Sequence, residues 1–191
     1  MAMRMGRTSC GAWKLRNPAG APDTTTASMT ESDIRIRPAR ADDTEWITAL
    51  APRMHEFGPP PWRDVQVMNN AVAQQWTSEL TNPTAGSVFL VAEDALGAAI
   101  GFVWCKTDRD YFTDMPVGHV VDIAVTKAGE GRGIGRALLD AAERWATDAG
   151  YPWITLHVFA GNDHARRVYE RRGYVPEWIR MLKQLEPPPP E

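Results

Sequence analysis

Cysteine is scarce in this sequence, with only Cys10 and Cys105 among 191 residues. Two cysteines cannot build the disulfide framework of a small secreted domain or a cysteine-based zinc site. No apolar run approaches the roughly 18 residues that a membrane-spanning helix needs. The opening segment MAMRMGRTSC also lacks the apolar core of a secretory signal. We therefore expect a cytoplasmic protein in a reducing compartment, without a metal and without a membrane partner.

Charge of neither sign dominates, since 21 basic residues stand against 24 acidic ones and the net charge is -3. This balance argues against a nucleic-acid-binding surface as the main function, because such surfaces are strongly basic. Hydrophobic residues make up 43% of the chain. A chain of this length and composition is long enough for one buried core and short for two.

The two ends of the chain lack the hydrophobic periodicity of helices and strands. Residues 1–32 are rich in Met, Gly, Ala, Thr and Pro, and we expect a disordered lead there. We favour a true start near Met29 over a transit peptide. The proline-rich residues 187–191 cannot continue a regular element, so they predict a frayed tail. The folded domain is expected over residues 33–186.

Apolar spacing and turn residues divide this domain into strands and helices. Strands are predicted over residues 34–37, 87–93, 98–106, 117–125, 153–158 and 174–185. Helices are predicted over residues 42–58, 65–80, 134–149 and 162–173, the first from the spacing of Trp46, Leu50 and Met54. Asn162 should cap the last helix and Gly173 should end it. The order predicts an α/β protein with a mixed sheet, helices on both faces, and a right-handed parallel strand-helix-strand unit over residues 117–158.

The segment GEGRGIGR, residues 129–136, connects a buried strand to a helix. Glycines at this point leave several backbone N–H groups exposed at the positive end of the helix dipole, which favours an anion. A nucleoside-triphosphate loop would continue with Lys and then Ser or Thr, whereas Arg136 and Ala137 stand here. The dinucleotide pattern fails on its glycine spacing. A tight turn without any ligand is the alternative interpretation.

These glycines resemble the coenzyme A signature of the GCN5-related N-acetyltransferases, the GNAT family. That signature is Gln or Arg, two residues, Gly, one residue, and Gly or Ala after an aliphatic strand, and Glu130, Gly133 and Gly135 occupy its places after DIAV. Glu130 departs from the pattern because an acid is unfavourable beside a pyrophosphate. We expect Glu130 to point away and Arg132 and Arg136 to supply positive charge.

A second motif, NDHARRVYERRGY, is similar to a family element at each of its defined places: Asn162, Ala165, Tyr169, Gly173 and Tyr174. Asn162 and Tyr169 are about two helical turns apart and share one face. The resemblance covers residues 34–185, the first part by element order only. It implies a mostly antiparallel, twisted sheet with a splayed central pair of parallel strands.

The resemblance also implies an activity, the transfer of an acetyl group from acetyl-CoA to a primary amine by direct attack. It implies that the Ile123 N–H faces the thioester carbonyl and that Tyr169 protonates the leaving sulfur. The coenzyme-binding residues implied in this way are Ile123, Ala124, Val125, Gly131, Arg132, Gly133, Ile134, Gly135, Arg136, Asn162, Ala165 and Tyr169.

Two residues of the central strand, His119 and Asp122, could take the proton from the amine. Strand alternation places them on opposite faces unless a bulge intervenes, so we expect only one to reach the substrate. Two loops carry acids mixed with aromatics, which suit an organic cation but are also typical of solvated loops. The candidate acceptor-binding residues are Glu56, Trp62, Asp108, Asp110 and Tyr111.

A second class of function is a non-catalytic GNAT-fold module that binds acyl-CoA as a sensor. Tyr169 and the two candidate bases favour the enzyme over the sensor. The expected partner is a small-molecule or peptide amine, and a homodimer is possible.

Overall fold

The computed structural model describes residues 34–185. The predicted lead over residues 1–32 and the tail over residues 187–191 lie outside the described residues. The strands are β1 (Arg35–Pro38), β2 (Val88–Glu93), β3 (Ala99–Arg109), β4 (Pro116–Val125) and β5 (Ile154–Leu156). The α-helices are α1 (Thr44–Ala49), α2 (Val65–Thr81), α3 (Ile134–Asp148) and α4 (Asp163–Arg171). Short 3-10 helices are η2 (Ala41–Asp43), η3 (Ala51–His55) and η4 (Lys127–Gly129).

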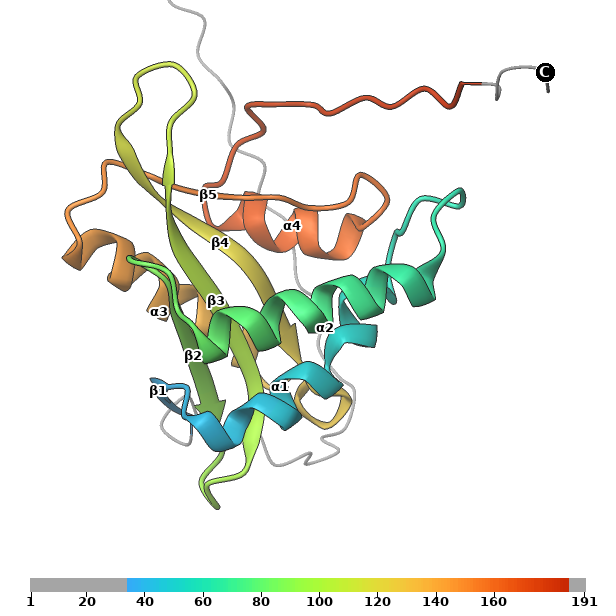
Figure 1. Cartoon of the computed structure of the whole chain (residues 1–191). Coiled ribbons are helices and arrows are strands. Elements are labelled where there is room, and N and C mark those ends of the chain that lie inside the picture. The colour runs from blue at the N-terminus through green and yellow to red at the C-terminus, as the bar shows by residue number, and fades with distance from the viewer. Residues whose placement is uncertain (1–33, 186–191) are drawn as a thin grey trace, which may run out of the picture.

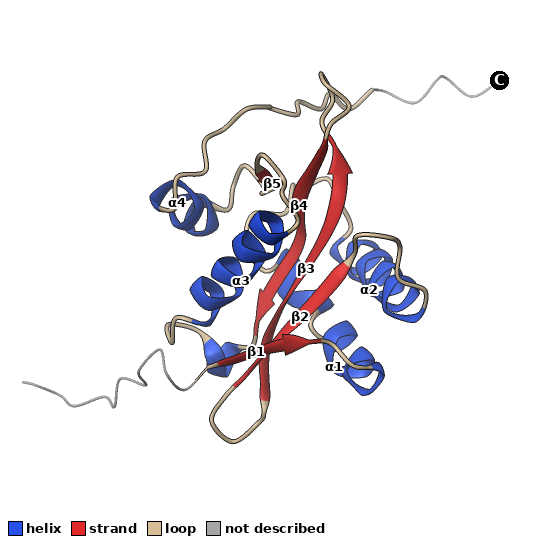
Figure 2. Ribbon diagram, turned by 90° about the vertical axis from the view of Figure 1, so that its left-hand side faces the viewer, coloured by secondary structure: helices blue, strands red, loops and turns tan. Residues whose placement is uncertain are grey.

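The five strands form one sheet in the order β1-β2-β3-β4-β5 (Figure 1). The first four strands pair antiparallel, and β4 pairs with β5 in parallel. The helices α1 and α2 cover one face, and α3 covers the other (Figure 2). The predicted mixed sheet, its helices on both faces and its parallel strand pair are therefore confirmed.

The core consists of two apolar layers, one on each face of the sheet. On the α2 face, Trp76 packs edge-on against Phe102, while on the α3 face Leu138 packs with Val103 and Val120. Neighbouring residues of β3 alternate between the two layers because successive side chains of a strand point to opposite faces. Each fully buried side chain of this size contributes roughly 1.5–3 kcal/mol. Cys105 belongs to the second layer, and burial raises the pKa of its thiol to about 12.

The first helix is shorter than predicted. The apolar spacing predicted one helix over residues 42–58, but α1 ends at Ala49 and the chain continues as η3. Pro52 explains the difference, because proline has no backbone N–H and disfavours the helical conformation of the residue before it. By contrast, α2 begins where predicted. The Asp64 side chain accepts hydrogen bonds from the backbone N–H groups of Gln66 and Val67.

The strand predicted over residues 174–185 does not form. This segment runs as an extended arm away from the sheet (Figure 1). Trp178 packs against Tyr111 and Phe112 at the β3–β4 turn, with ring centroids 5.4 and 5.5 Å apart. Pro176 also cannot donate to a strand ladder. The predicted strand over residues 153–158 is likewise shortened to β5, because the chain separates from β4 after Leu156.

Candidate active site

The glycine segment forms a strand-to-helix turn with two left-handed residues, Gly131 at φ 72° and Gly133 at φ 79°. A Cβ at either position would meet nothing within 4 Å, so these glycines are required by backbone conformation rather than by space. Gly133 is the N-cap of α3, and no side chain in the described part of the protein caps this helix end. The first N–H groups of α3 therefore have no side-chain acceptor, which fits an anion at this end.

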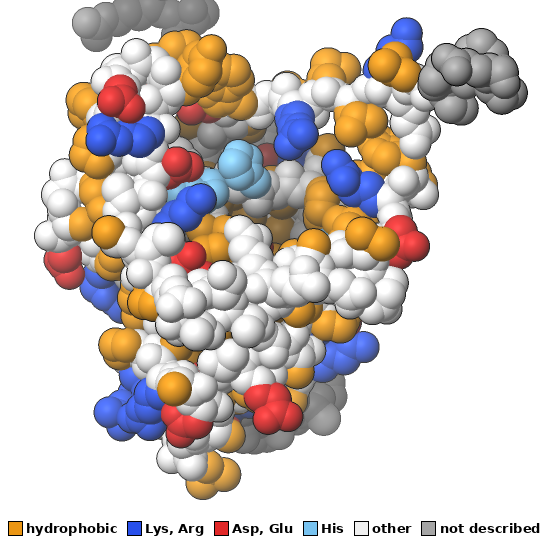
Figure 3. All heavy atoms as spheres, viewed as in Figure 1, with side chains coloured by type: hydrophobic (Ala, Val, Ile, Leu, Met, Phe, Trp, Pro, Cys, Tyr) orange, Lys and Arg blue, Asp and Glu red, His pale blue; other side chains and the backbone are white. Residues whose placement is uncertain are grey.

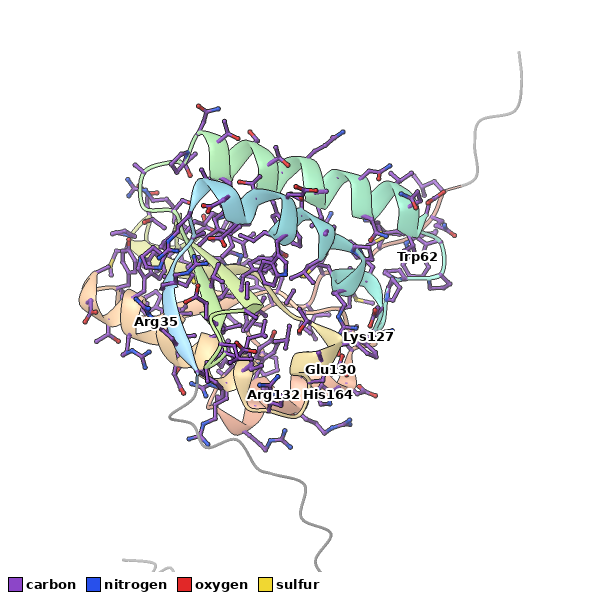
Figure 4. All side chains as sticks on the ribbon, turned by 90° about the horizontal axis from the view of Figure 1, so that it is seen from below. Arg35, Trp62, Lys127, Glu130, Arg132 and His164 are labelled. Atoms are coloured by element: carbon purple, nitrogen blue, oxygen red, sulfur yellow. The ribbon has the colours of Figure 1, made fainter. Side chains whose placement is uncertain are left out.

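Charged residues line this turn. Arg136 lies 4.0 Å from Asp140 on the next turn of α3, and an Arg132 guanidinium N–H donates to the Ala128 carbonyl at 3.3 Å. The Glu130 carboxylate pairs with the Arg53 guanidinium of η3. Figure 4, which views the molecule from below, shows Lys127, Glu130 and Arg132 along the turn between β4 and α3.

Within residues 34–185, one edge of β4 has no strand partner beyond Val120. Pairing with β5 covers only residues 118–120, where Val120 opposes Leu156. On the β3 side, the Thr126 N–H donates to the Ile100 carbonyl at 3.0 Å. Because backbone groups alternate along a strand, the N–H and C=O groups of Ile123 and Val125 point away from β3, toward the gap beside β5.

Helix α4 carries two of the predicted coenzyme-binding residues, its N-cap Asn162 and Tyr169. Asn162 caps α4 as predicted, since its side-chain oxygen accepts a hydrogen bond from the Ala165 N–H at 3.1 Å. Tyr169 is half-buried on the same helix, and its ring lies 5.8 Å from that of Tyr174. Burial raises the pKa of the Tyr169 phenol, and the nearby charge of Asp122 raises this pKa further. The fold thus brings Tyr169 of α4 into the neighbourhood of Asp122 of β4.

A β-bulge decides where the two candidate bases lie. Trp104 opposes Asp122 whereas Cys105 opposes Val120, so Val121 is an extra residue on β4. The bulge resets the alternation, and His119 and Asp122 lie on the same face of the sheet, the face that α2 covers. His119 and Asp122 were expected on opposite faces only if β4 had no bulge. Because β4 has one at Val121, the two side chains share a face.

Asp122 and His119 nevertheless have different surroundings. The Asp122 carboxylate accepts a hydrogen bond from the Trp76 indole N–H at 2.7 Å. Burial raises its pKa, although this hydrogen bond and the charge of His55 oppose the rise. The His119 ring is buried, with Nδ1 at 2.8 Å from the Thr155 hydroxyl and its centroid 5.0 Å from that of His157. Burial, and then the charge of His157, lower the pKa of His119 to about 4.

The candidate acceptor residues fall into two separate groups. Glu56 pairs with Arg53 beside the end of β4, and the nearby loop carries Trp62, which is half-exposed. The other group lies at the β3–β4 turn, at the opposite end of β4.

In this second group the Asp110 carboxylate is already bound to Thr113, through its N–H at 2.8 Å and its hydroxyl at 2.6 Å. Asp108 accepts a hydrogen bond from the Arg109 N–H at 2.9 Å. Tyr111 lines an open groove of about 410 Å³ with His157 and Trp178. Figure 3 shows histidine side chains in a hollow of this face.

Several residues of the site had no signal in the sequence. His55 is buried with Nδ1 at 2.7 Å from the Asn69 side-chain oxygen, and its ring lies 6.1 Å from that of Phe159. Gly58 lies against Gly161, and a Cβ at Gly58 would come within 2.6 Å of the backbone there. The loop before α2 and the turn before α4 are therefore in contact. No motif or spacing connects these pairs along the chain.

The model of the acetyltransferase (GNAT) family matches residues 47–174. The chain belongs to the GNAT family. A mycothiol acetyltransferase of Nocardiopsis dassonvillei is 33% identical to this GNAT chain over 147 residues, which cover 74% of this chain and 42% of that protein. The same enzyme of Propionibacterium freudenreichii is 34% identical over 146 residues, with coverages of 74% and 43%. The GNAT chain thus spans less than half the length of these two relatives.

Solved structures also resemble the GNAT chain. A protein of Pyrococcus furiosus, assigned as an acetyl transferase, is 28% identical with a TM-score of 0.66, covering 80% of this chain and 100% of that one. An aminoglycoside N-acetyltransferase in complex with CoA has a TM-score of 0.60 at 21% identity, covering 79% of this chain and 94% of the other. At 21% identity, the likeness to the aminoglycoside N-acetyltransferase shows that the two chains share a fold.

Within residues 34–185, no group of three or more His, Cys, Asp or Glu side chains could hold a metal ion. No helix in this described part is long and apolar enough to cross a membrane.

Proposed function

We propose that the chain is an acetyl-CoA-dependent N-acetyltransferase that transfers an acetyl group to a primary amine of a small molecule or peptide. The observation that carries this proposal is the position of Asp122 and Tyr169 beside the open edge of β4, on the strand that leads into the glycine turn. Acetyl-CoA, when bound, supplies the activated acetyl thioester. Because the chain covers only part of its relatives, their substrates are proposals for it.

The residues present fit the coenzyme. The uncapped start of α3, residues 131–136, offers N–H groups to the pyrophosphate, and Arg132 and Arg136 lie on the same segment. The outward backbone groups of Ile123 and the N–H of Val125 suit the amides of the pantetheine arm, with Ala124 between them, whereas the Val125 carbonyl accepts a hydrogen bond from Arg53. Asn162 retains its side-chain N–H₂ for a carbonyl, because its oxygen caps α4. Ala165 leaves room on that helix face.

Asp122 is assigned as the base that takes the proton from the attacking amine, directly or through a water. A raised pKa makes its carboxylate a stronger base than an exposed aspartate, and the Trp76 indole holds it in place. His119 suits this role less well, since burial lowers the pKa of His119 but raises that of Asp122, and the Nδ1 of His119 is bound to Thr155. Tyr169 is assigned as the acid, because a raised pKa keeps its phenol protonated at neutral pH.

The alternative is a coenzyme-binding sensor, and the ionisable pair of Asp122 and Tyr169 beside the gap favours the enzyme over it. Release of free thiol from acetyl-CoA should be measured with a panel of amines. The panel should contain aminoglycosides, deacetylated mycothiol, polyamines and peptides with a free N-terminus. Amine-dependent thiol release supports the enzyme. Coenzyme binding without turnover on any amine favours the sensor.

A homodimer is proposed for the assembly. The arm over residues 174–185 exposes apolar side chains, with exposed fractions of 82% for Val175, 83% for Ile179 and 89% for Met181. The same chain presents β5 as an edge strand. Two copies can satisfy both features reciprocally if each arm covers the β5 edge of the other copy. Light scattering should find a dimer that becomes a monomer when the chain ends at Gly173, and a monomeric full chain would contradict the proposal.

A further inference from the structure

Arg53 joins three segments that are distant in the sequence. Its Nε donates to the carbonyl oxygen of Val125 at 3.1 Å, at the end of β4. Its two terminal nitrogens bind the carboxylates of Glu56 and Glu130. The Arg53 side chain is only 14% exposed. The guanidinium therefore has a fixed position between η3, the end of β4 and the segment that leads into the glycine turn.

The charges around Arg53 are close to balance. Glu130 and Glu56 supply two negative charges, whereas Arg53 and Lys127 supply two positive ones, with Lys127 4.0 Å from Glu56. Lys127 is 79% exposed at its side chain, so solvent screens its charge more than that of Arg53. Removing Arg53 would leave the Glu130 carboxylate without its direct counter-charge. This carboxylate lies close to the start of α3, the end of the helix that favours an anion.

We propose that Arg53 is a positioning residue for the coenzyme, which neutralises Glu130 and thereby makes the start of α3 usable by a pyrophosphate. This inference rests on the proposed function, in which the start of α3 holds the phosphates. Glu130 stands where the coenzyme signature has Gln or Arg. Arg53 restores at this point the charge that the glutamate takes away. It does so from η3, the 3-10 helix that also carries His55.

The test is a pair of substitutions at Arg53 and Glu130, with the Kd for CoA measured by calorimetry. Arg53→Met should raise this Kd about tenfold, because an unpaired carboxylate then repels the phosphates. Arg53→Met combined with Glu130→Gln should return the Kd close to that of the wild type. Glu130→Gln alone should leave the Kd unchanged or lower it. Pantetheine, which lacks the phosphates, should bind Arg53→Met and the wild type equally.

Arg37 provides a matched control. Its side chain is 10% exposed and binds two acids, Asp43 and Glu93. Arg37→Met breaks a similar pair of contacts away from the glycine turn and should leave the Kd for CoA unchanged. Arg53→Lys retains the positive charge and should stay within a few-fold of the wild type. If Arg53→Met unfolds, Arg53→Gln removes the charge but keeps a hydrogen-bond donor for the Val125 carbonyl, and it should raise the Kd for CoA about tenfold.

The outcomes separate this inference from the proposed function. A wild type that does not bind CoA overturns both. Normal CoA binding by Arg53→Met overturns only the role of Arg53. A double variant that binds as weakly as Arg53→Met shows that the charge of Glu130 is not the cause, and this also overturns the inference. If Arg53→Met binds pantetheine more weakly by the same factor as CoA, the substitution distorts the whole site. This result would also overturn the inference.

Discussion

The carboxylate of Asp122 accepts a hydrogen bond from the indole N–H of Trp76, with 2.7 Å between Oδ2 and Nε1. Trp76 is completely buried in the layer between α2 and the sheet, so this contact fixes Asp122 against a rigid part of the core. The bulge at Val121 turns Asp122 to this face. The position of the proposed base is therefore set by one extra residue in β4 and one aromatic side chain of α2.

Asp122→Asn should lower kcat by roughly 10²-fold or more, because the amide cannot accept a proton from the amine. The amide oxygen can still accept the Trp76 hydrogen bond, so the fold and the Kd for acetyl-CoA should be unchanged. His119→Gln on the same strand and face is the matched control and should retain most of the turnover. The opposite result would transfer the role of base to His119.

The pH dependence gives a second measurement of the same assignment. The wild-type kcat should fall as the pH decreases through the pKa of Asp122, since only the ionised carboxylate accepts a proton. Burial raises this pKa, so the fall should begin at a higher pH than for an exposed aspartate. Asp122→Asn should lose this acid limb. A limb that persists unchanged in the variant would show that another group controls it.

Tyr169→Phe should lower kcat by roughly 10²-fold or more while the Kd for acetyl-CoA hardly changes. The ring keeps its packing beside Tyr174, and only the proton donor is lost. Steady-state kinetics and calorimetry together separate the two quantities. Full activity in the variant would mean that water or another residue protonates the thiolate. A large loss of binding with unchanged kcat would instead give Tyr169 a ground-state role.

The sequence predicted those features that depend on local patterns. Helix α3 and its glycine turn follow from residues that are adjacent in the chain, and so does the Asn162 cap of α4. The first helix was predicted too long because the apolar spacing was given more weight than Pro52, which indicates that a helix ends. Residues 174–185 have the apolar content of a strand, but pairing requires an edge that the local sequence does not specify.

Non-local features of the site could not be predicted in this way. The bulge depends on the register of β3 against β4, because a strand alone does not show which residue is left unpaired. Arg53 binds Glu130 across 77 positions without any shared motif. Glu130 departs from the coenzyme signature, and a role of Arg132 and Arg136 in supplying positive charge stays a prediction. The structure adds Arg53, which pairs directly with Glu130.

Gly133→Asp should abolish coenzyme binding and retain the fold. A Cβ at this position meets nothing within 4 Å, so the cost to folding is that of the left-handed backbone, roughly 1–2 kcal/mol. Its carboxylate would lie at the start of α3, where it occupies and repels the site of the phosphates. Gly97→Asp is the matched control, because Gly97 has the same φ of 79° and open space, but lies in the β2–β3 turn.

Calorimetric titration with acetyl-CoA and urea unfolding should be run on both variants. Gly97→Asp should lose a similar free energy of unfolding and keep the wild-type Kd. An unchanged Kd in Gly133→Asp would rule out the start of α3 as the phosphate site.

His119 should make the protein less stable in mild acid. Burial and the neighbouring His157 and Lys106 lower its pKa to about 4, against the opposing charge of Asp108. The unfolded chain has the ordinary histidine value of 6.5, so between these values the unfolded state binds more protons than the folded state. The stability contributed by neutral His119 is therefore complete above pH 6.5 and is lost as the pH falls toward 4. The loss reaches at most about 3 kcal/mol.

Urea unfolding from about pH 7 to about pH 4.5 measures this effect as the change in the free energy of unfolding. His119→Gln should flatten the decline, because the amide does not titrate and can still bond to the Thr155 hydroxyl. His164→Gln, at an exposed histidine of α4, should keep the wild-type decline. If His119→Gln loses stability with acid as steeply as the wild type, the decline comes from carboxylates and not from the His119 pair with His157.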